Sequence, residues 1–328
     1  MGEFDLIEAI RARTALRRDD VRLGIGDDAA LLAPPSGHLL ASSIDTLVEG
    51  VHFPAGTAPE DLGWKALAVN LSDLAAMGAT PAWALLALTL PAADARFVER
   101  FADGFAELAR LHSLALVGGD TTQGPLSISV AVHGFVPAAA ALTRAGARAG
   151  DLLLVTGTLG DAAAGLVCLD RQHARADALL AAPNGTREAL LVRLNRPAPR
   201  VAAGQALRGV ASACIDISDG LLADLGHLCT ASGVGAEIDA ATLPLSSALL
   251  TLFDDEARMG FALAGGDDYE LCFSVAPERA AAATADLARL GCGVTRIGRI
   301  VAAPGVRVQG ADGRELAPPR RGYEHFAR

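Results

Sequence analysis

One local pattern recurs along this chain and constrains its fold more than any other feature. Apolar runs of strand length end in glycine and aspartate, and a helical pattern often follows, as at 151–169 and 212–232. Both halves alternate strands and helices in this way, which predicts an α/β (α+β) fold with two domains. The segment 137–150 has no clear periodicity, so we expect domains at 1–137 and 138–328.

Residues 24–53 place carboxylates around two short apolar runs. Asp27 and Asp28 stand in a glycine-flanked loop, and Asp45 follows the second run. A strand–turn–strand would bring them to neighbouring edges. Carboxylates with few basic residues nearby repel one another unless cations neutralise them, and Mg²⁺ is a common cation for such oxygens. The alternative is ordinary turn chemistry, because aspartate in a Gly-Asp pair bonds its own backbone.

The case for metal depends on recurrence. Loops at strand ends are where α/β proteins place ligands, and scattered monodentate carboxylates suit octahedral Mg²⁺, whereas zinc would need clustered His and Cys. The further aspartates in this context are Asp73, Asp120, Asp216, Asp219, Asp267 and Asp268.

A helix predicted from about residue 57 to Met77 carries Asp73 on a largely apolar surface. Asn70 lies three residues earlier and shares its face. An aspartate is costly to bury on such a helix unless something binds it. An exposed edge of the helix explains the same residues equally well.

Phosphate binding needs donors as well as metal. A short strand at 115–117 is expected to end in Gly118-Gly119, and a second glycine turn lies at 157–160; both could offer backbone N–H groups. Ser218 is placed to cap the helix that follows it. Arg144 is the nearest basic candidate, and a solvated surface arginine is its alternative.

Composition excludes several classes of protein. The net charge of −10 in 328 residues leaves no basic stripe for a nucleic-acid partner. Lys65 lies in Gly-Trp-Lys-Ala-Leu and is the only lysine, so no Walker-type phosphate loop exists. The five cysteines form no Cys-x-x-Cys pair, which favours free thiols in a reducing cytoplasm. We expect no signal segment and no membrane span.

Six motifs in this order resemble the bacterial thiamine-monophosphate kinase family, and the resemblance covers nearly the whole chain from GEFDLI to GYEHF. The wider superfamily includes aminoimidazole ribonucleotide synthetase, selenophosphate synthetase and a hydrogenase-maturation protein. The second and last motifs are the ones that indicate the thiamine branch. The motifs are GIGDDAAL, SSIDTLVEGVHF, NLSDLAAMGATP, LVGGDTT, DISDGL and GGDDYEL.

The resemblance implies ATP-dependent phosphorylation of thiamine monophosphate to thiamine diphosphate, without a phosphoenzyme and without an assigned catalytic side chain. It implies a homodimer whose N-terminal sheets close a barrel, and an ATP and metal site in the cleft between domains. By similarity, several Mg²⁺ ions would be held by Asp28, Ser43, the Ile44 carbonyl, Asp45, Asp73, Asp120, Asp216 and Asp219. A K⁺ requirement is left open.

The same resemblance assigns Gly119, Asp120, Arg144 and Ser218 to ATP. His52 would contact the substrate, with Asp267 and Tyr323 near its thiamine end. Relatives commonly carry Trp where this chain has Tyr323, and Gly-Gly-Glu-Asp where it has Gly-Gly-Asp-Asp. Which of Asp267 and Asp268 faces the substrate is therefore open.

Two alternatives remain at this point. The chain could be another ATP-dependent enzyme of the superfamily with a different phosphorylated or carboxylated acceptor. It could also be a Mg²⁺–nucleotide sensor without turnover, although a sensor has no need of acceptor residues.

Overall fold

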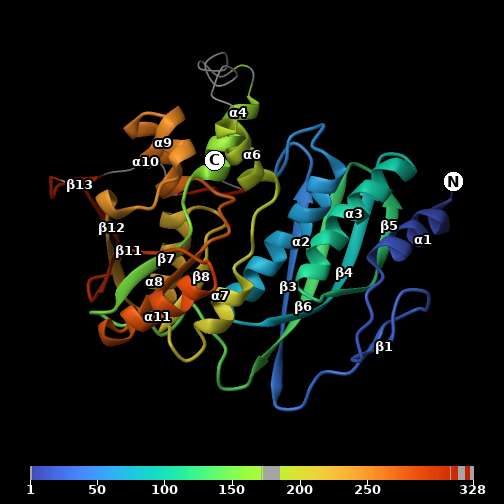
Figure 1. Cartoon of the computed structure of the whole chain (residues 1–328), viewed down its shortest axis with the longest axis horizontal. Helices are drawn as coiled ribbons and strands as arrows, with labels where there is room; N and C mark the ends of the chain where they lie inside the picture. The colour runs from blue at the N-terminus through green and yellow to red at the C-terminus, as the bar shows by residue number, and fades with distance from the viewer. Residues whose placement is uncertain (1, 171, 173–184, 311, 317–321, 326–328) are drawn as a thin grey trace. The chain divides into compact units, whose positions relative to one another are not determined.

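The computed structural model describes residues 2–170, 172, 185–310, 312–316 and 322–325 (Figure 1). The chain divides into two compact units. Unit 1 comprises Met1–Leu74 and Ala79–Ala141, and unit 2 comprises Ala75–Gly78 and Leu142–Arg328. Each unit mixes helices with a sheet, which confirms the predicted α/β (α+β) class with two domains.

Unit 1 is a sheet with helices on one face. The strand order is β3-β6-β4-β5, with β4 and β5 parallel and the other neighbours antiparallel. Figure 1 shows α2 and α3 running across the same face of this sheet. Its elements are α1 Glu3–Thr14, β1 Val21–Leu23, β2 Leu31–Leu32, β3 His38–Val48, α2 Pro59–Ala76, β4 Thr80–Leu90, α3 Ala95–Leu111, β5 Ala115–Gln123 and β6 Ser127–Pro137.

The hairpin expected within residues 24–53 is wrong. β2 pairs with β1, not with β3. β3 instead pairs along its whole length with β6, from His38 opposite Pro137 to Val48 opposite Ser127. An eleven-residue ladder offers far more backbone hydrogen bonds than a two-residue strand can, so the long pairing decides where β3 goes.

Two glycines let α2 and α3 pack with their backbones in contact. A Cβ on Gly63 would lie 2.0 Å from the Phe101 carbonyl oxygen, and one on Gly104 would lie 1.8 Å from the Glu60 carbonyl oxygen. Only glycine fits such an approach, which explains its presence inside two helices where it lowers helix propensity. Although α2 is strongly apolar, neither it nor any other described helix has the length and hydropathy of a membrane span.

Unit 2 has a mixed sheet of order β13-β12-β9-β11-β7-β10-β8, in which only the β9–β12 pairing is parallel among the described strands. Helices and short turns connect the strands. Its elements are β7 Leu152–Thr156, α4 Asp161–Leu169, α6 Thr186–Asn195, α7 Val201–Ala206, β8 Ala213–Asp216, α8 Leu221–Ser232, β9 Gly235–Asp239, η1 Ala240–Thr242, α9 Ser247–Leu252, α10 Asp255–Ala264, β10 Leu271–Val275, α11 Pro277–Arg289, β11 Val294–Val301, β12 Gly305–Gln309 and β13 Glu315–Leu316.

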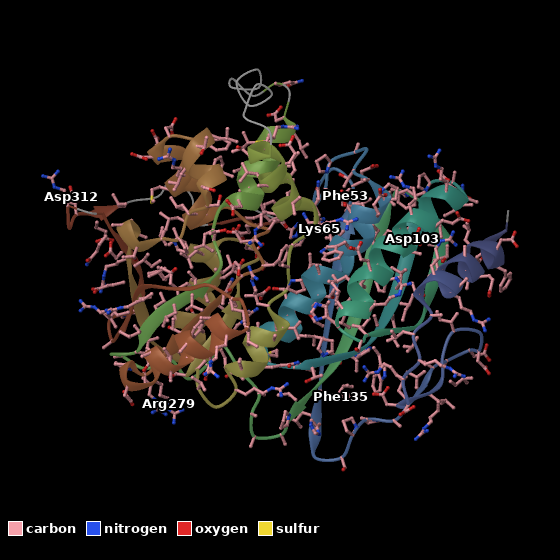
Figure 2. All side chains as sticks on the ribbon, viewed as in Figure 1. Phe53, Lys65, Asp103, Phe135, Arg279 and Asp312 are labelled. Atoms are coloured by element: carbon pink, nitrogen blue, oxygen red, sulfur yellow. The ribbon has the colours of Figure 1, made fainter. Side chains whose placement is uncertain are left out.

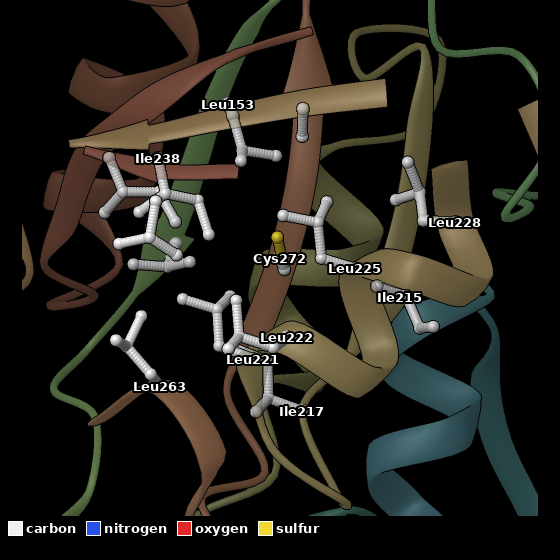
Figure 3. Close-up of a cluster of buried hydrophobic side chains, with 14 of the residues drawn as sticks. Leu153, Ile215, Ile217, Leu221, Leu222, Leu225, Leu228, Ile238, Leu263 and Cys272 are labelled. Carbon is white, nitrogen blue, oxygen red and sulfur yellow. The ribbon is translucent and has the colours of Figure 1, made fainter. Parts of the chain in front are cut away.

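The core of unit 2 lies between α8 and the sheet. Leu225 of α8 lies beside Cys272 of β10, and Leu221 and Leu228 belong to the same cluster of buried side chains (Figure 3). Each fully buried leucine contributes roughly 1.5–3 kcal/mol relative to exposure. This packing fixes the position of α8, and with it the loop between β8 and α8 that carries Ser218 and Asp219.

Candidate functional site

At one edge of the sheet in unit 1, β3 and α2 bring two predicted metal ligands together. The Ser43 hydroxyl donates to Asp73 Oδ2 at 2.5 Å, so Asp73 faces the sheet and not an exposed edge of the helix. Asp45 lies two residues after Ser43 on the same face of the strand. Ile44 points to the opposite face and its side chain is exposed, so it has only a carbonyl to offer a metal.

Asn70, one helical turn before Asp73, is fully buried. Its amide nitrogen donates to the Ala66 carbonyl at 3.0 Å, whereas its Oδ1 has no hydrogen-bond partner in the described structure. An unsatisfied buried carbonyl oxygen is costly, and it is also a hard ligand suited to Mg²⁺ or to its bound water. The donor set on this part of α2 therefore fits a hard cation.

Gly118, Gly119 and Asp120 lie at the other edge, on β5. The expected short strand at 115–117 is too short: β5 continues to Gln123 because it pairs in parallel with β4. Gly119 approaches β4 so closely that a Cβ would lie 1.8 Å from the Leu86 carbonyl oxygen. Glycine is thus required for strand packing here, whatever its role toward a phosphate.

A cavity of ≈ 1070 Å³ opens beside β5 within unit 1. Asp27, Asp28 and Asp120 line it together with Gly119, and Arg11 of α1 contributes a cation. Its other walls are mostly apolar residues of α1, β2, β4 and β5, together with His133 of β6 and with Glu8, which pairs with Arg11 at 3.4 Å. The structure therefore places Asp28 and Asp120 on the same cavity, although not by the predicted hairpin.

Asp45 does not line this cavity, although the cavity reaches His133 on the neighbouring strand β6. Asp45 pairs with Val130, Val130 pairs with Leu86, and Leu86 pairs with Gly119. Asp45 and Gly119 are thus at the same level of the sheet but three strands apart, which is about 14 Å. Within unit 1 the predicted metal ligands form two groups, one at each edge.

His52 follows β3 in a turn that fixes its tautomer. The Val48 N–H donates to His52 Nδ1 at 3.0 Å, so a neutral ring carries its proton on Nε2. The buried Lys65 supports the turn, because its Nζ donates to the His52 carbonyl at 3.4 Å (Figure 2, near Phe53).

Unit 2 gathers a second group of predicted residues. The Asp267 N–H donates to the Ser218 carbonyl at 2.8 Å, and the Tyr323 N–H donates to the Asp219 carbonyl at 3.0 Å. Asp216, at the end of β8, pairs with Leu271 of β10. Segments far apart in sequence thus meet around the loop 218–220.

Several ionisable side chains lie near Asp219 in this second group. Burial is the main cause that raises the pKa of Asp219, and the nearby Asp267 raises it further, while His325 and His227 act in the opposite direction. Arg144 is exposed on unit 2, where its carbonyl accepts a hydrogen bond from Ser232.

Nowhere in the described residues do three or more His, Cys, Asp or Glu side chains converge as a ready metal cage. Any Mg²⁺ must therefore complete its shell with water or ligand oxygens.

The predicted cap of α8 is wrong. Gly220 occupies the N-cap position, and the carboxylate of Asp224, not Ser218, accepts the N–H groups of the loop. The sequence did contain a signal for Asp224, because it is a charged residue on the apolar helix LLADLGHL, as Asp73 is on α2.

The glycine turn 157–160 is also not a phosphate site. The Gly157 N–H donates to the Gly293 carbonyl at 2.9 Å, and the Gly160 N–H donates to both oxygens of Asp268 at 3.0 and 2.8 Å. Asp268 is 2% exposed. Its carboxylate is therefore used inside the fold, and its burial raises its pKa well above the ordinary value.

Asp267 has the opposite environment. It is partly exposed, its backbone takes φ +68°, and the Tyr269 hydroxyl donates to its Oδ1 at 2.9 Å. Below it, the fully buried Glu270 accepts from Arg193 at 2.7 Å and from Arg200 at 2.6 and 2.5 Å. Of the two adjacent aspartates, only Asp267 is partly exposed.

Comparison with known proteins identifies the family of this chain. The family model for the N-terminal domain of AIR synthase related protein matches residues 26–136, and the model for the C-terminal domain matches residues 148–311. The thiamine-monophosphate kinase of Escherichia coli K12 is 49% identical over 99% of this chain and 98% of its own length.

Solved structures give the same result. The crystal structure of thiamine-monophosphate kinase from Stenotrophomonas maltophilia K279a is similar with a TM-score of 0.86 and 50% identity, over 96% of this chain and 98% of that one. AaThiL complexed with AMPPCP and TMP is similar with a TM-score of 0.76 and 34% identity, over 99% and 97% of the two chains. This chain therefore belongs to the thiamine-monophosphate kinase family of AIR synthase related proteins.

Proposed function

We propose that this chain transfers the γ-phosphoryl group of ATP to the phosphate of thiamine monophosphate, giving ADP and thiamine diphosphate. The observation that carries the proposal is the group in unit 2, where Ser218 and Asp219 adjoin Asp267 and Tyr323. Residues that the sequence resemblance assigns to metal, nucleotide and acceptor thus adjoin one loop. Its relatives support the assignment, since AaThiL is described in complex with AMPPCP, an analogue of ATP, and with TMP.

Mg²⁺ ions would neutralise the phosphates and align them for in-line transfer. The residues that would hold these ions are Asp28, Ser43, the Ile44 carbonyl, Asp45, Asp73, Asp120, Asp216 and Asp219. The protein's own part is positioning. Both reactants are anionic, so without cations they would repel each other. The attacking group is a phosphate oxygen, which needs little help from a general base, and none is assigned here.

Acceptor recognition fits the two ends of thiamine monophosphate. The Nε2–H of His52 is a donor suited to a phosphate oxygen, because Val48 holds the ring in that tautomer. The thiamine end is cationic. Asp267 offers it a carboxylate held by Tyr269, and the half-exposed ring of Tyr323 offers it an aromatic face.

We further propose that a homodimer completes the metal site. Asp45 and Asp120 lie at opposite edges of the sheet in one chain, as the register of the strands requires. If the sheets of two copies close a barrel, β3 of one copy comes to the edge at which the other copy carries β5. A second copy would then supply Asp28 and Asp120 to the side of the site that holds Ser43 and Asp73.

Mixing two inactive variants tests this shared site. Asp45→Asn and Asp120→Asn should each lose nearly all turnover as pure proteins. When they are unfolded together and refolded as mixed dimers, about a quarter of wild-type activity should return, because half of the dimers carry one intact site. Mixed dimers without activity would mean that each site is built from one chain.

The reaction itself is tested on the wild-type protein. ADP release from Mg-ATP is measured with and without thiamine monophosphate, and thiamine diphosphate is followed by chromatography. One thiamine diphosphate per ADP is expected. ADP release with a different acceptor would indicate a sibling enzyme, and nucleotide binding without turnover would indicate a sensor. A K⁺ requirement and a cytoplasmic location stay predictions of the sequence.

A further inference from the structure

The loop 218–220 is held by one carboxylate that the proposed reaction does not use. Asp224 lies in the first turns of α8 and is 4% exposed. A single oxygen, Oδ2, accepts the N–H groups of Ser218 and Asp219 at 3.0 Å each and that of Gly220 at 3.1 Å. Three successive N–H groups that converge on one point form an anion-binding arrangement, and here the protein's own carboxylate fills it.

The carbonyl side of the same loop is also occupied. The Ser218 carbonyl accepts from the Asp267 N–H, and the Asp219 carbonyl accepts from the Tyr323 N–H. The backbone of the loop is therefore held from both sides. The side chains of Ser218 and Asp219 remain partly exposed.

A side chain at the N-cap position itself, residue 220, could not accept these N–H groups in place of Asp224. Gly220 has φ +116°, and a Cβ there would lie 2.9 Å from the Ala264 carbonyl carbon. A capping Ser or Thr at this position is excluded by that contact. The carboxylate comes at a cost, because burial and the adjacent Asp219 raise the pKa of Asp224 to about 7, against the effect of the three N–H groups.

We propose that Asp224 is a positioning residue, which sets the side chains of Ser218 and Asp219 for nucleotide and metal by holding their backbone N–H groups on one oxygen. The proposal rests on the proposed function of that loop. Asp224 itself touches neither reactant. It also links the loop to the acceptor residues, because Ser218 and Asp219 carry the contacts to Asp267 and Tyr323 as well.

Three variants and one control test the proposal in the full-length chain. Asp224→Ala removes the acceptor, Asp224→Glu moves it by one methylene, and Asp224→Asn keeps an oxygen at the same place. Asp254→Ala is the matched control, because Asp254 caps α10 of the same unit through the Ala257 N–H at 3.0 Å. The measurements are thermal unfolding, binding of Mg-AMPPCP by calorimetry, and the Mg²⁺ concentration for half-maximal activity.

We expect Asp224→Ala and Asp224→Glu to weaken Mg-AMPPCP binding and to raise the Mg²⁺ midpoint by on the order of 10-fold. Asp224→Asn should stay within about threefold of wild type, and Asp254→Ala should lower only the unfolding temperature. Unchanged binding and Mg²⁺ midpoints in folded Asp224→Ala would overturn the proposal. If that variant does not fold, Asp224→Glu decides by the same criterion.

Calorimetry also separates this proposal from the proposed function. Binding of Mg-AMPPCP needs no turnover and no acceptor. A wild-type protein that makes no thiamine diphosphate would remove the proposed reaction, while a weakened affinity in Asp224→Glu would still support the role of Asp224.

Discussion

The chain contains Gly-Asp-Asp twice, and the two copies have opposite environments. At 26–28 both carboxylates are exposed and line the cavity beside β5. At 266–268 the second carboxylate is buried against Gly160, and only the first is partly exposed. The same tripeptide therefore has two different environments, because the surrounding fold decides which carboxylate is exposed and which is hydrogen-bonded to buried backbone.

The backbones differ as well. In the first copy Gly26 takes φ +121°, and Asp27 bonds the N–H of its neighbour at 2.9 Å, which is ordinary turn chemistry. In the second copy the aspartate itself takes a positive φ, +68° at Asp267. Such a conformation costs about 1 kcal/mol or more in a residue other than glycine. The ion pairs of Glu270 and the Asp268–Gly160 contact hold it in place.

Asp28→Asn should have the largest effect if the first copy holds metal. Loss of one ligand charge should lower kcat by roughly 100-fold or more and raise the Mg²⁺ midpoint. Because Asp28 is exposed, the unfolding temperature should stay unchanged. Wild-type turnover at ordinary Mg²⁺ would remove Asp28 from the metal site.

Asp268→Ala tests whether the second copy carries a structural carboxylate. The variant leaves the buried Gly160 N–H without its acceptor, which should lower the free energy of unfolding by about 1–3 kcal/mol. Thermal or urea unfolding measures this change. Asp268→Asn keeps an oxygen and should lose less. Equal stability of the alanine variant and the wild type would contradict the structural role.

Asp267→Asn should affect the acceptor and leave the fold intact. Removing the charge that faces the cationic thiamine end should raise KM for thiamine monophosphate about 10-fold, which corresponds to about 1.4 kcal/mol. KM for ATP should change little. Steady-state kinetics with each substrate varied in turn gives both constants. An increase confined to the KM for ATP would move Asp267 to the nucleotide side of the site.

Asp27→Asn should have the smallest effect. The asparagine keeps an acceptor for the Asp28 N–H, and the exposed side chain has no assigned ligand. We expect kcat within about threefold of wild type and an unchanged unfolding temperature. A loss as large as that of Asp28→Asn would show that both carboxylates of the first copy hold metal.

Local signals in the sequence predicted much of the fold. Period-two alternation identified β6, a capping pattern at 57–60 and the stop at Gly78 identified α2, and the apolar run after Gly220 identified α8. The partners of short segments were not predictable in the same way. β2 has two residues and could pair with either neighbour, and nothing local indicated that β5 would extend through Gly118 and Gly119 to pair with β4.

The motifs name candidate site residues, which stay a prediction, but they could not show how these residues are arranged. The contact from Gly160 to Asp268 joins residues 108 apart, so the sequence could not show that this aspartate and this glycine turn satisfy each other. Asp224 was missed because a serine before a helix is the commoner cap.

Transfer of label from [γ-³²P]ATP in a single turnover tests the central claim most directly. With Mg²⁺ and thiamine monophosphate, the label should appear in the terminal phosphate of thiamine diphosphate, with none retained on the protein. Label that stays on the protein, or that is released as inorganic phosphate whether or not thiamine monophosphate is present, would contradict direct transfer between the two bound phosphates.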